Sequence, residues 1–322
     1  MFDKHIKLIV MLILGGLGFS LGPAVAGSAD FPQKPLKLVV TASAGGGEDM
    51  ETRGILPYVE KYLGTSLIIE NQPGAGGKIA FEKFQKTKPD GYTLIVYSFP
   101  KSIIMEYLSK TNYRTKDFTP VFFWSRTDNF VVVNSETWQT FEDLVKTAKT
   151  KTISIGIPGI GGNSHLSGLM LFDKLGIKAN WVPYEAGAAS FAALAGKHLD
   201  AAIGSSITTL APLVDAGKLR LITCLSDKRD PFFPDVPTPK ELGFNINLVV
   251  PLRGVEAPPH TPPALVKKLE EAFSKAAKDP GFIAWAKKNK VVLNPVNANN
   301  FRKIVDETYT VIEKVQHMLR EK

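Results

Sequence analysis

Ala44-Gly45-Gly46-Gly47-Glu48-Asp49 follows the strand-like run Leu36–Thr41 and leads into a segment whose apolar residues recur at helical spacing. The sequence here predicts a strand, a glycine turn and a helix. A second stretch, Gly159-Ile160-Gly161-Gly162-Asn163-Ser164, follows the run Thr152–Ile157 and predicts the same three elements. The start of a helix leaves backbone N–H groups free and carries the positive end of the helix dipole. We therefore expect each turn to suit an anionic oxygen.

Strand-like and helical patterns alternate on both sides of these turns, which predicts parallel sheets with crossover helices. The expected strands are Leu36–Thr41, Ser66–Glu70, Thr93–Tyr97, Val131–Asn134, Thr152–Ile157, Ala179–Val182 and Ala201–Gly204, and the expected helices are Met50–Leu63, Gly77–Lys86, Thr140–Ala148, His165–Leu175 and Ala188–Ala195. The chain is long enough for two domains, each with its own core.

The last quarter of the chain, beyond Lys240, offers too little material for a third domain. It contains an expected helix, Ala264–Lys278, a strand-like run, Val291–Leu293, and an expected final helix, Ala298–Leu319. We expect these elements to complete the first domain, so that the chain crosses between the domains twice. The predicted boundaries are 27–127 plus 250–322 for the first domain and 128–249 for the second.

The N-terminus has the pattern of a secretory signal peptide. Lys4 and Lys7 precede the apolar stretch Leu8–Leu21, and Ala24-Val25-Ala26 follows as a small-residue cleavage pattern. The apolar stretch is shorter than the roughly 20 residues that a membrane-spanning helix needs. We expect a periplasmic protein, cleaved near Ala26.

Composition excludes several classes of function. The net charge of +8 comes from dispersed lysines with no arginine-aromatic cluster, so we expect no nucleic-acid partner. The single cysteine, Cys224, lies in an apolar run and is interpreted as a buried strand residue rather than a catalytic one. No His or Cys spacing typical of a metal site occurs, and we expect neither a metal nor a cofactor.

Ordered motifs across the whole predicted mature chain resemble the periplasmic solute-binding proteins of tripartite tricarboxylate transporters, the Bug-type receptors. The resemblance rests on the two glycine turns and on Phe31-Pro32-Gln33-Lys34-Pro35, Glu70-Asn71-Gln72-Pro73-Gly74-Ala75-Gly76-Gly77, Pro89-Asp90-Gly91-Tyr92-Thr93-Leu94, Val182-Pro183-Tyr184, Gly217-Lys218-Leu219-Arg220, Pro234-Asp235-Val236-Pro237-Thr238 and Arg253-Gly254-Val255. It implies a two-lobed α/β Venus-flytrap fold, each lobe a mostly parallel sheet flanked by helices. It further implies a monomeric receptor that captures a small organic acid and delivers it to membrane permease subunits.

The resemblance also implies which residues contact the ligand. In the first lobe it implies contacts from Ser43, Ala44, Gly45, Gly46, Gly47 and Asp49, together with Ser98, Phe99 and Lys101. In the second lobe it implies contacts from Gly159, Gly161, Gly162, Asn163, Ser164, Tyr184, Ala186, Gly187, Ala188, Gly204 and Ser205. Arg253 occupies a position where part of the family has arginine after tryptophan, although Leu252 stands in place of the tryptophan.

Several of these residues have a structural alternative. Asp49 either contacts the ligand or caps the first helix. Arg253 either faces the cleft and binds a carboxylate through both guanidinium nitrogens, or serves as a surface or interlobe ion-pair partner. Glu48 and Glu185 depart from the family pattern by placing carboxylates near an anion site, so a nitrogen-bearing or singly charged acid stays open as the ligand.

The sequence is also compatible with two other functions. The same fold could serve a sensor that presents its closed form to a membrane histidine kinase. An exported α/β hydrolase is the other alternative, but Ser164 and His165 lie outside any GxSxG elbow and no phosphate-loop pattern occurs. We therefore expect no catalytic residues.

Overall fold

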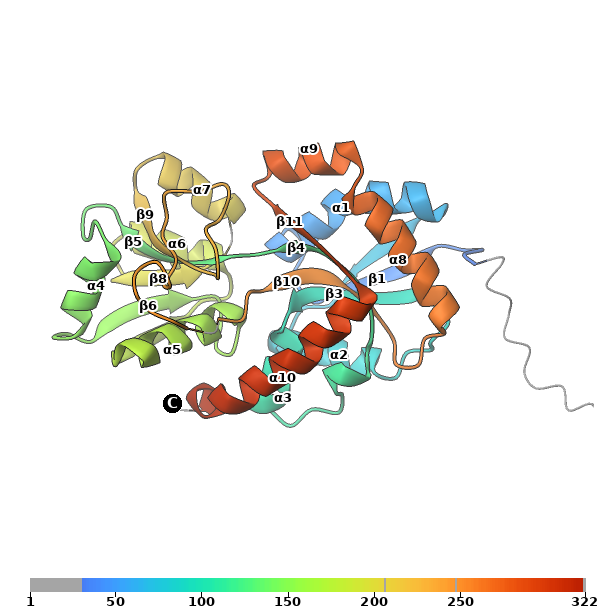
Figure 1. Ribbon diagram of the computed structural model, residues 1–322, viewed down its shortest axis with the longest axis horizontal. Coiled ribbons are helices and arrows are strands. Elements are labelled where there is room, and N and C mark those ends of the chain that lie inside the picture. Colours follow the sequence, from blue (N-terminus) through green and yellow to red (C-terminus); the bar gives the residue numbers. More distant parts are fainter. Residues whose placement is uncertain (1–30, 206, 247, 321–322) are drawn as a thin grey trace, which may run out of the picture. The chain divides into compact units, whose positions relative to one another are not determined.

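A computed structural model describes residues 31–205, 207–246 and 248–320. From Pro32 onward the chain forms one compact unit that contains two β-sheets, both flanked by helices (Figure 1). The predicted signal peptide and its cleavage site lie outside the described residues.

The first sheet is six-stranded, in the order β11-β4-β10-β3-β1-β2. Its strands are β1 (Leu36–Val40), β2 (Leu67–Asn71), β3 (Thr93–Phe99), β4 (Thr119–Arg126), β10 (Leu252–Ala257) and β11 (Val292–Asn297). Strand β1 pairs in parallel with β2 and β3, whereas β10 runs antiparallel between β3 and β4. The sheet is therefore mixed, and the expectation that it is mostly parallel is wrong, because β10 pairs antiparallel with β3 and β4, and β11 pairs antiparallel with β4.

Helices cover both faces of this sheet. Successive strand residues point to opposite faces, so neighbouring residues of one strand pack against different helices. In β4, Phe123 stacks on Phe301 of one helix, while its neighbour Trp124 stacks on Phe273 of another. One face carries α2 (Lys78–Phe84), α3 (Lys101–Leu108) and α10 (Ala298–Arg320), and α1 (Gly47–Leu63) and α8 (Pro263–Ala277) pack on the other, with α9 (Pro280–Lys288) against α1 (Figure 1).

The second sheet is five-stranded, in the order β7-β6-β8-β5-β9. Its strands are β5 (Asn129–Asn134), β6 (Ile153–Ile157), β7 (Ala179–Pro183), β8 (Ala201–Gly204) and β9 (Leu219–Leu225). Val131 and Val133 of β5 pack with α4 (Phe141–Ala148) and α5 (Asn163–Leu175). Phe130 and Val132 pack with α6 (Gly187–Ala195) and α7 (Ile207–Asp215).

The chain passes between the sheets twice, from β4 to β5 and from β9 to β10. Thr127 in the first crossing donates its backbone N–H to the carbonyl of Pro251 in the second at 2.8 Å. The two crossings therefore run side by side. The boundaries of the two lobes at residues 127/128 and 249/250 remain a prediction.

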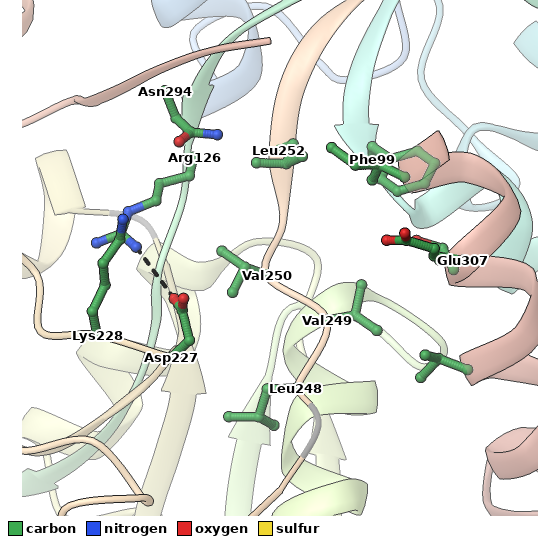
Figure 2. A pocket seen from close by; sticks show the side chains of 13 residues that line it. Phe99, Arg126, Asp227, Lys228, Leu248, Val249, Val250, Leu252, Asn294 and Glu307 are labelled. Atoms are coloured by element: carbon green, nitrogen blue, oxygen red, sulfur yellow. Dashed lines mark ion pairs between the residues drawn. The ribbon is translucent and has the colours of Figure 1, made fainter. Parts of the chain in front are cut away.

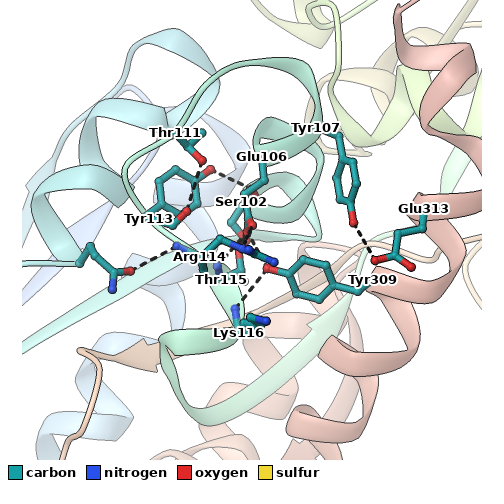
Figure 3. A network of polar contacts seen from close by, with 11 residues as sticks. Ser102, Glu106, Tyr107, Thr111, Tyr113, Arg114, Thr115, Lys116, Tyr309 and Glu313 are labelled. Atoms are coloured by element: carbon teal, nitrogen blue, oxygen red, sulfur yellow. Dashed lines mark hydrogen bonds and ion pairs between the residues drawn. The ribbon is translucent and has the colours of Figure 1, made fainter.

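A polar network joins α3 to α10 (Figure 3). The carboxylate of Glu106 accepts hydrogen bonds from the Tyr309 hydroxyl at 2.7 Å and from both the backbone N–H and the hydroxyl of Thr115. Arg114 adds an ion pair to Glu106 at 2.9 Å. This network fixes the last helix against the helix that follows β3.

The interpretation of Cys224 as a buried strand residue is confirmed, since it lies in β9 and is fully buried. The sequence patterns did not predict β10, which occupies an interior position of the first sheet. Its segment includes a buried arginine, a glycine and a buried glutamate, so it lacks the continuous apolar pattern of a core strand.

Candidate functional site

A pocket of about 340 Å³ lies between the two sheets and draws residues from both. Five helices contribute their first residue to its wall, namely Gly47 of α1, Lys101 of α3, Asn163 of α5, Gly187 of α6 and Ile207 of α7. Helix starts bring free N–H groups and positive dipole ends to one place. The pocket is therefore suited to anionic groups on the side of either sheet.

The first glycine turn is held by Asp49. Gly46 donates its N–H to the Ser43 carbonyl at 3.1 Å, and Gly45 adopts a φ of 77°, which favours glycine. The Asp49 carboxylate accepts from the Gly45 N–H at 2.9 Å, from Arg53 at 2.9 Å and from Asn71 at 3.0 Å. Burial raises the pKa of Asp49, but these hydrogen bonds outweigh it and leave the pKa below its ordinary value. Asp49 thus braces the turn from behind.

Asp49 does not cap α1 with its side chain. The N-cap residue is Gly46, and it makes no side-chain capping bond. The prediction that Asp49 caps the helix is therefore wrong, because its carboxylate is engaged by Gly45, Arg53 and Asn71.

Glu48 lines the pocket but is bonded into the protein. Its two carboxylate oxygens accept from the Thr41 hydroxyl at 2.9 Å and from the backbone N–H of Ser98 at 3.1 Å. The side chain is 7% exposed. Its carboxylate therefore connects the start of α1 to the end of β3.

Arg253 of β10 also lines the pocket, and its guanidinium is paired. Nη1 forms a buried ion pair with Glu51 of α1 and donates to the Gly47 carbonyl at 3.1 Å. Nη2 donates to the Ser98 hydroxyl oxygen at 3.0 Å. The ion pair is buried and lies within the first sheet and its helices, so the predicted surface or interlobe location of such a pair is wrong.

The second glycine turn is braced by a neutral histidine. His165 Nδ1 accepts the Gly161 N–H at 3.1 Å, and burial lowers the pKa of His165 to about 4. The Ser164 hydroxyl donates to Asn129 Oδ1 at 2.8 Å. Ser164 and His165 thus serve different partners, which agrees with the expectation that they form no catalytic pair.

Asn163 links the two sides of the pocket. Its Nδ2 donates to the Ser98 carbonyl at 3.3 Å, from the start of α5 to the end of β3. Gly161 makes a second close approach, because a side chain there would overlap Leu108 of α3. The second turn therefore sits directly against the first-sheet helix α3.

The pocket brings together twelve of the predicted ligand-binding residues, from both glycine turns, the end of β3, the start of α3, the segments after β7 and β8, and β10. They are Ser43, Gly46, Gly47, Ser98, Lys101, Gly162, Asn163, Ser164, Ala186, Gly187, Ser205 and Arg253. The others lie outside its lining: Ala44, Gly45, Asp49, Phe99, Gly159, Gly161, Tyr184, Ala188 and Gly204.

The pocket lining is rich in charged residues, of which the sequence predicted Lys101 and Arg253 as ligand contacts. Among the described lining residues there are four cationic side chains, Lys101, Arg126, Lys290 and Arg253, and five anionic ones, Glu48, Glu51, Asp128, Glu185 and Asp230. Arg126 is the last residue of β4, and Asp128 and Asp230 belong to the crossings between the sheets, where no local pattern marks a site. Glu51 falls one helical turn after Gly47, and that spacing is the signal that could have found it.

Arg126, at the end of β4, borders a second cavity of about 460 Å³, which is also lined by the second crossing and by α10 (Figure 2). Its guanidinium pairs with the buried Asp128 at 3.0 Å and with Asp227 at 3.6 Å. Burial raises the pKa of Asp128 to about 6 even though Arg126 opposes this rise. One guanidinium therefore ties the two crossings together beside both cavities.

The described residues contain neither a membrane-spanning helix nor a cluster of metal ligands. No helix in residues 31–205, 207–246 and 248–320 is both long and apolar enough to cross a membrane. Within the same residues, no group of three or more His, Cys, Asp or Glu side chains is placed to hold a metal ion.

Comparison with known families and sequences gives consistent matches. Residues 52–319 match the family described as "Tripartite tricarboxylate transporter family receptor" (TctC). A UPF0065 protein of Cupriavidus necator is 33% identical over 307 residues, covering 93% of this chain and 93% of its own. BugT of Bordetella pertussis is 26% identical, covering 83% of this chain and 84% of its own.

Solved structures show the same fold. A TctC solute-binding protein from Polaromonas superposes with a TM-score of 0.75 at 25% identity and covers 90% of this chain and 99% of its own. MatC from Rhodopseudomonas palustris with bound malate has a TM-score of 0.78 at 26% identity, with 89% and 100% covered. An R. palustris protein solved with adipate reaches 0.80 at 26% identity, with 90% and 98% covered.

Proposed function

This chain belongs to the tripartite tricarboxylate transporter receptor family, and we propose that it captures a small organic carboxylate between its two sheets and delivers it to the permease of such a transporter. It is a Bug-type solute-binding receptor and not an enzyme, since the family and its structural neighbours are solute-binding proteins. Receptors of this family are periplasmic. We extend that location to this chain, with cleavage near Ala26 and a monomeric mature form.

The observation that carries the ligand proposal is the convergence of five helix starts on one pocket. N–H groups at helix starts bind carboxylate oxygens without a charged side chain. At the first turn, Gly47 begins α1 and lines the pocket, while Ser98 lies beside it. Malate-bound and adipate-bound relatives of the same fold support an organic acid as the ligand.

Capture proceeds by closure in this proposal. The two crossings, which are hydrogen-bonded to each other at Thr127 and Pro251, bend when the two sides close on the ligand. Closure forms the hydrogen bond between Asn163 and Ser98. The ligand stabilises the closed arrangement because it contacts both sides only there. The permease then recognises the closed form.

Position 47 offers a sharp test of the ligand proposal. A Cβ atom at Gly47 would meet no other atom within 4 Å, so the backbone there has room for a side chain. Gly47→Asp places a negative charge at the proposed carboxylate site and should weaken acid binding by about tenfold or more through like-charge repulsion. Gly47→Ala is the matched control and should bind nearly as well as the wild type.

The measurement is calorimetry of the purified, ligand-free protein against mono-, di- and tricarboxylates, preceded by a thermal-shift screen. Equal binding by the two variants would contradict a carboxylate at the first turn. Small-angle scattering should show compaction with the acid that binds. Uptake of the same acid by cells with and without the gene tests the permease, and mass spectrometry of the secreted protein tests cleavage near Ala26.

A further inference from the structure

Three charged side chains are buried together where the two crossings meet the pocket. Arg126 ends β4, Asp128 lies in the first crossing and Asp230 lies in the second, and all three line the pocket. Their exposed fractions are 6%, 2% and 1%. We call these residues the crossing cluster. It holds one cation for two carboxylates, and a buried carboxylate that is not fully compensated favours the uptake of a proton.

The single cation of the cluster is shared with groups outside it. Arg126 Nη2 pairs with Asp128 at 3.0 Å and also donates to the Arg229 carbonyl at 3.3 Å. Arg126 Nη1 lies 3.6 Å from Asp227 and donates to the Ser226 hydroxyl oxygen at 3.4 Å (Figure 2). The Asp227 side chain is 75% exposed. The charge of Arg126 is therefore divided between a buried carboxylate and an exposed one.

The surroundings of Asp128 favour its protonated form. Burial raises the pKa of Asp128 to about 6, against the charge of Arg126. The charges of Asp230 and Asp227 add to this rise, and the Ser226 hydroxyl lowers the pKa. The thiol of Cys224 in β9 also faces this carboxylate, but burial raises the pKa of Cys224, so the thiol stays neutral.

The second buried carboxylate is better placed to stay ionised. Asp230 Oδ1 accepts the backbone N–H of Phe232 at 2.7 Å. Burial raises the pKa of Asp230, but this N–H and the charges of Arg126 and Lys290 oppose the rise. In the described chain no backbone N–H donates to Asp128. Of the two carboxylates, Asp128 is therefore the one that takes up a proton more readily.

An acid in the pocket brings further negative charge to the same wall. Like charges repel over several ångströms when little water lies between them, so a bound carboxylate disfavours the ionised form of Asp128. Protonation of Asp128 in turn leaves the Arg126 charge less compensated, which favours an anion in the pocket. Binding of the acid and binding of the proton therefore strengthen each other, and the coupling is reciprocal.

We propose that this receptor binds its acid together with a proton, which Asp128 takes up at the crossings. This inference rests on the proposed function, because it takes an anionic ligand in the pocket as given. It makes the affinity depend on pH. Below pH 6 the free protein already holds most of this proton, and the affinity is highest. As the pH rises, Asp128 in the free protein ionises and the affinity falls.

Calorimetry in buffers of different ionisation enthalpy counts the protons that the wild type takes up on binding. The probes are malate, succinate and adipate, and the uptake is measured for each of them that binds. A tenfold coupling between acid and proton gives an uptake of about half a proton at pH 6.5. The same coupling makes binding about fivefold weaker at pH 8 than at pH 6.

Asp128→Asn identifies the group that holds the proton, because asparagine has nearly the shape of the neutral acid and cannot ionise. This variant should lose the proton uptake, and its affinity should no longer fall between pH 6 and pH 8. Asp227→Asn is the matched control, since it removes the exposed carboxylate from the same guanidinium at a residue outside the pocket lining. It should keep the proton uptake. Thermal denaturation checks that both variants are folded.

The outcomes separate this inference from the proposed function. Binding by the wild type without proton uptake at pH 6.5 would overturn the inference and leave the carboxylate receptor standing. Uptake that persists in Asp128→Asn would also overturn it, because the proton would then reside on the acid or on another residue. Absence of binding by every acid, with a folded protein, would overturn the proposed function and this inference with it.

Discussion

Ser98 Oγ accepts a hydrogen bond from Arg253 Nη2 at 3.0 Å, at the point where β3 enters the ligand pocket. Since Arg253 has no acceptor atom in its guanidinium, the Ser98 hydroxyl proton stays available to the pocket. Arg253 is itself held by Glu51 and by the Gly47 carbonyl. The buried ion pair therefore positions a neutral donor beside the first glycine turn.

Ser98→Ala removes that donor and should weaken acid binding by about tenfold, since a hydrogen bond to a charged group contributes about 1.5–3 kcal/mol. Ser98→Thr keeps the hydroxyl and is the control. Calorimetry measures both affinities, and urea unfolding checks that stability is little changed. Equal loss of affinity in both variants would show that the hydroxyl is not the group that matters.

Arg253→Met should destabilise the fold by about 3–5 kcal/mol, because it leaves the Glu51 carboxylate buried without its cation. Glu51 keeps hydrogen bonds from Trp124 and Ser125, but these donors carry no charge. Adding Glu51→Gln to Arg253→Met should recover much of the loss. Urea denaturation of the single and double variants measures the coupling energy between the two residues. If their changes in the free energy of unfolding simply add, Arg253 and Glu51 do not stabilise each other.

Alanine substitutions at Gly159 and Gly161 distinguish the cost of backbone strain from the cost of steric overlap. Both have positive φ, 70° and 89°, so alanine at either position costs about 1–2 kcal/mol. A side chain at Gly159 meets nothing within 4 Å, whereas one at Gly161 overlaps Leu108 of α3. Gly161→Ala should therefore weaken ligand binding more than Gly159→Ala, because it pushes the second turn away from α3. Calorimetry with thermal denaturation of both variants provides the comparison.

Glu256 should make stability depend on pH. Burial raises the pKa of Glu256 to about 8, although the Tyr97 hydrogen bond at 2.7 Å and the charge of Arg302 both lower it. The folded state then holds a proton that the unfolded state has released between about pH 4.5 and pH 8. Stability should fall as pH rises through this window, by about 1 kcal/mol per pH unit from this group.

Glu256→Gln cannot ionise, so its stability should lack this decline. Thermal denaturation of the wild type and the variant from pH 5 to pH 8 should show a difference that grows with pH in favour of the variant. A constant difference across the range would mean that Glu256 does not carry the effect.

Tyr309→Phe should destabilise the protein by about 1–3 kcal/mol, because it removes a hydrogen bond to the largely buried Glu106 carboxylate. Tyr107→Phe is the comparison, since its hydroxyl bonds to Glu313 at an exposed site and should matter less (Figure 3). Urea denaturation measures both. A larger effect at Tyr107 would contradict the assignment of Glu106 as the anchor of α10.

The local sequence was enough to predict most elements around the two glycine turns. Strand β8 matches the predicted Ala201–Gly204, and α1 and α5 begin within three residues of the predicted starts. Glycines, β-branched runs and helical spacing act over a few residues, so they can be read without the rest of the chain. The same patterns also indicated that two turns suited to anions exist.

The tertiary structure alone decided what surrounds those turns. The sequence did not reveal that Arg253 pairs with Glu51, about two hundred residues earlier, or that Ser164 gives its proton to Asn129. Nor did it reveal that Glu48 is bonded inward while Glu185 faces the pocket. Each of these depends on which strands become neighbours, and strand order is set by packing of the whole sheet rather than by local propensity. The sequence predicted two turns suited to anions, and the fold decided which side chains surround them.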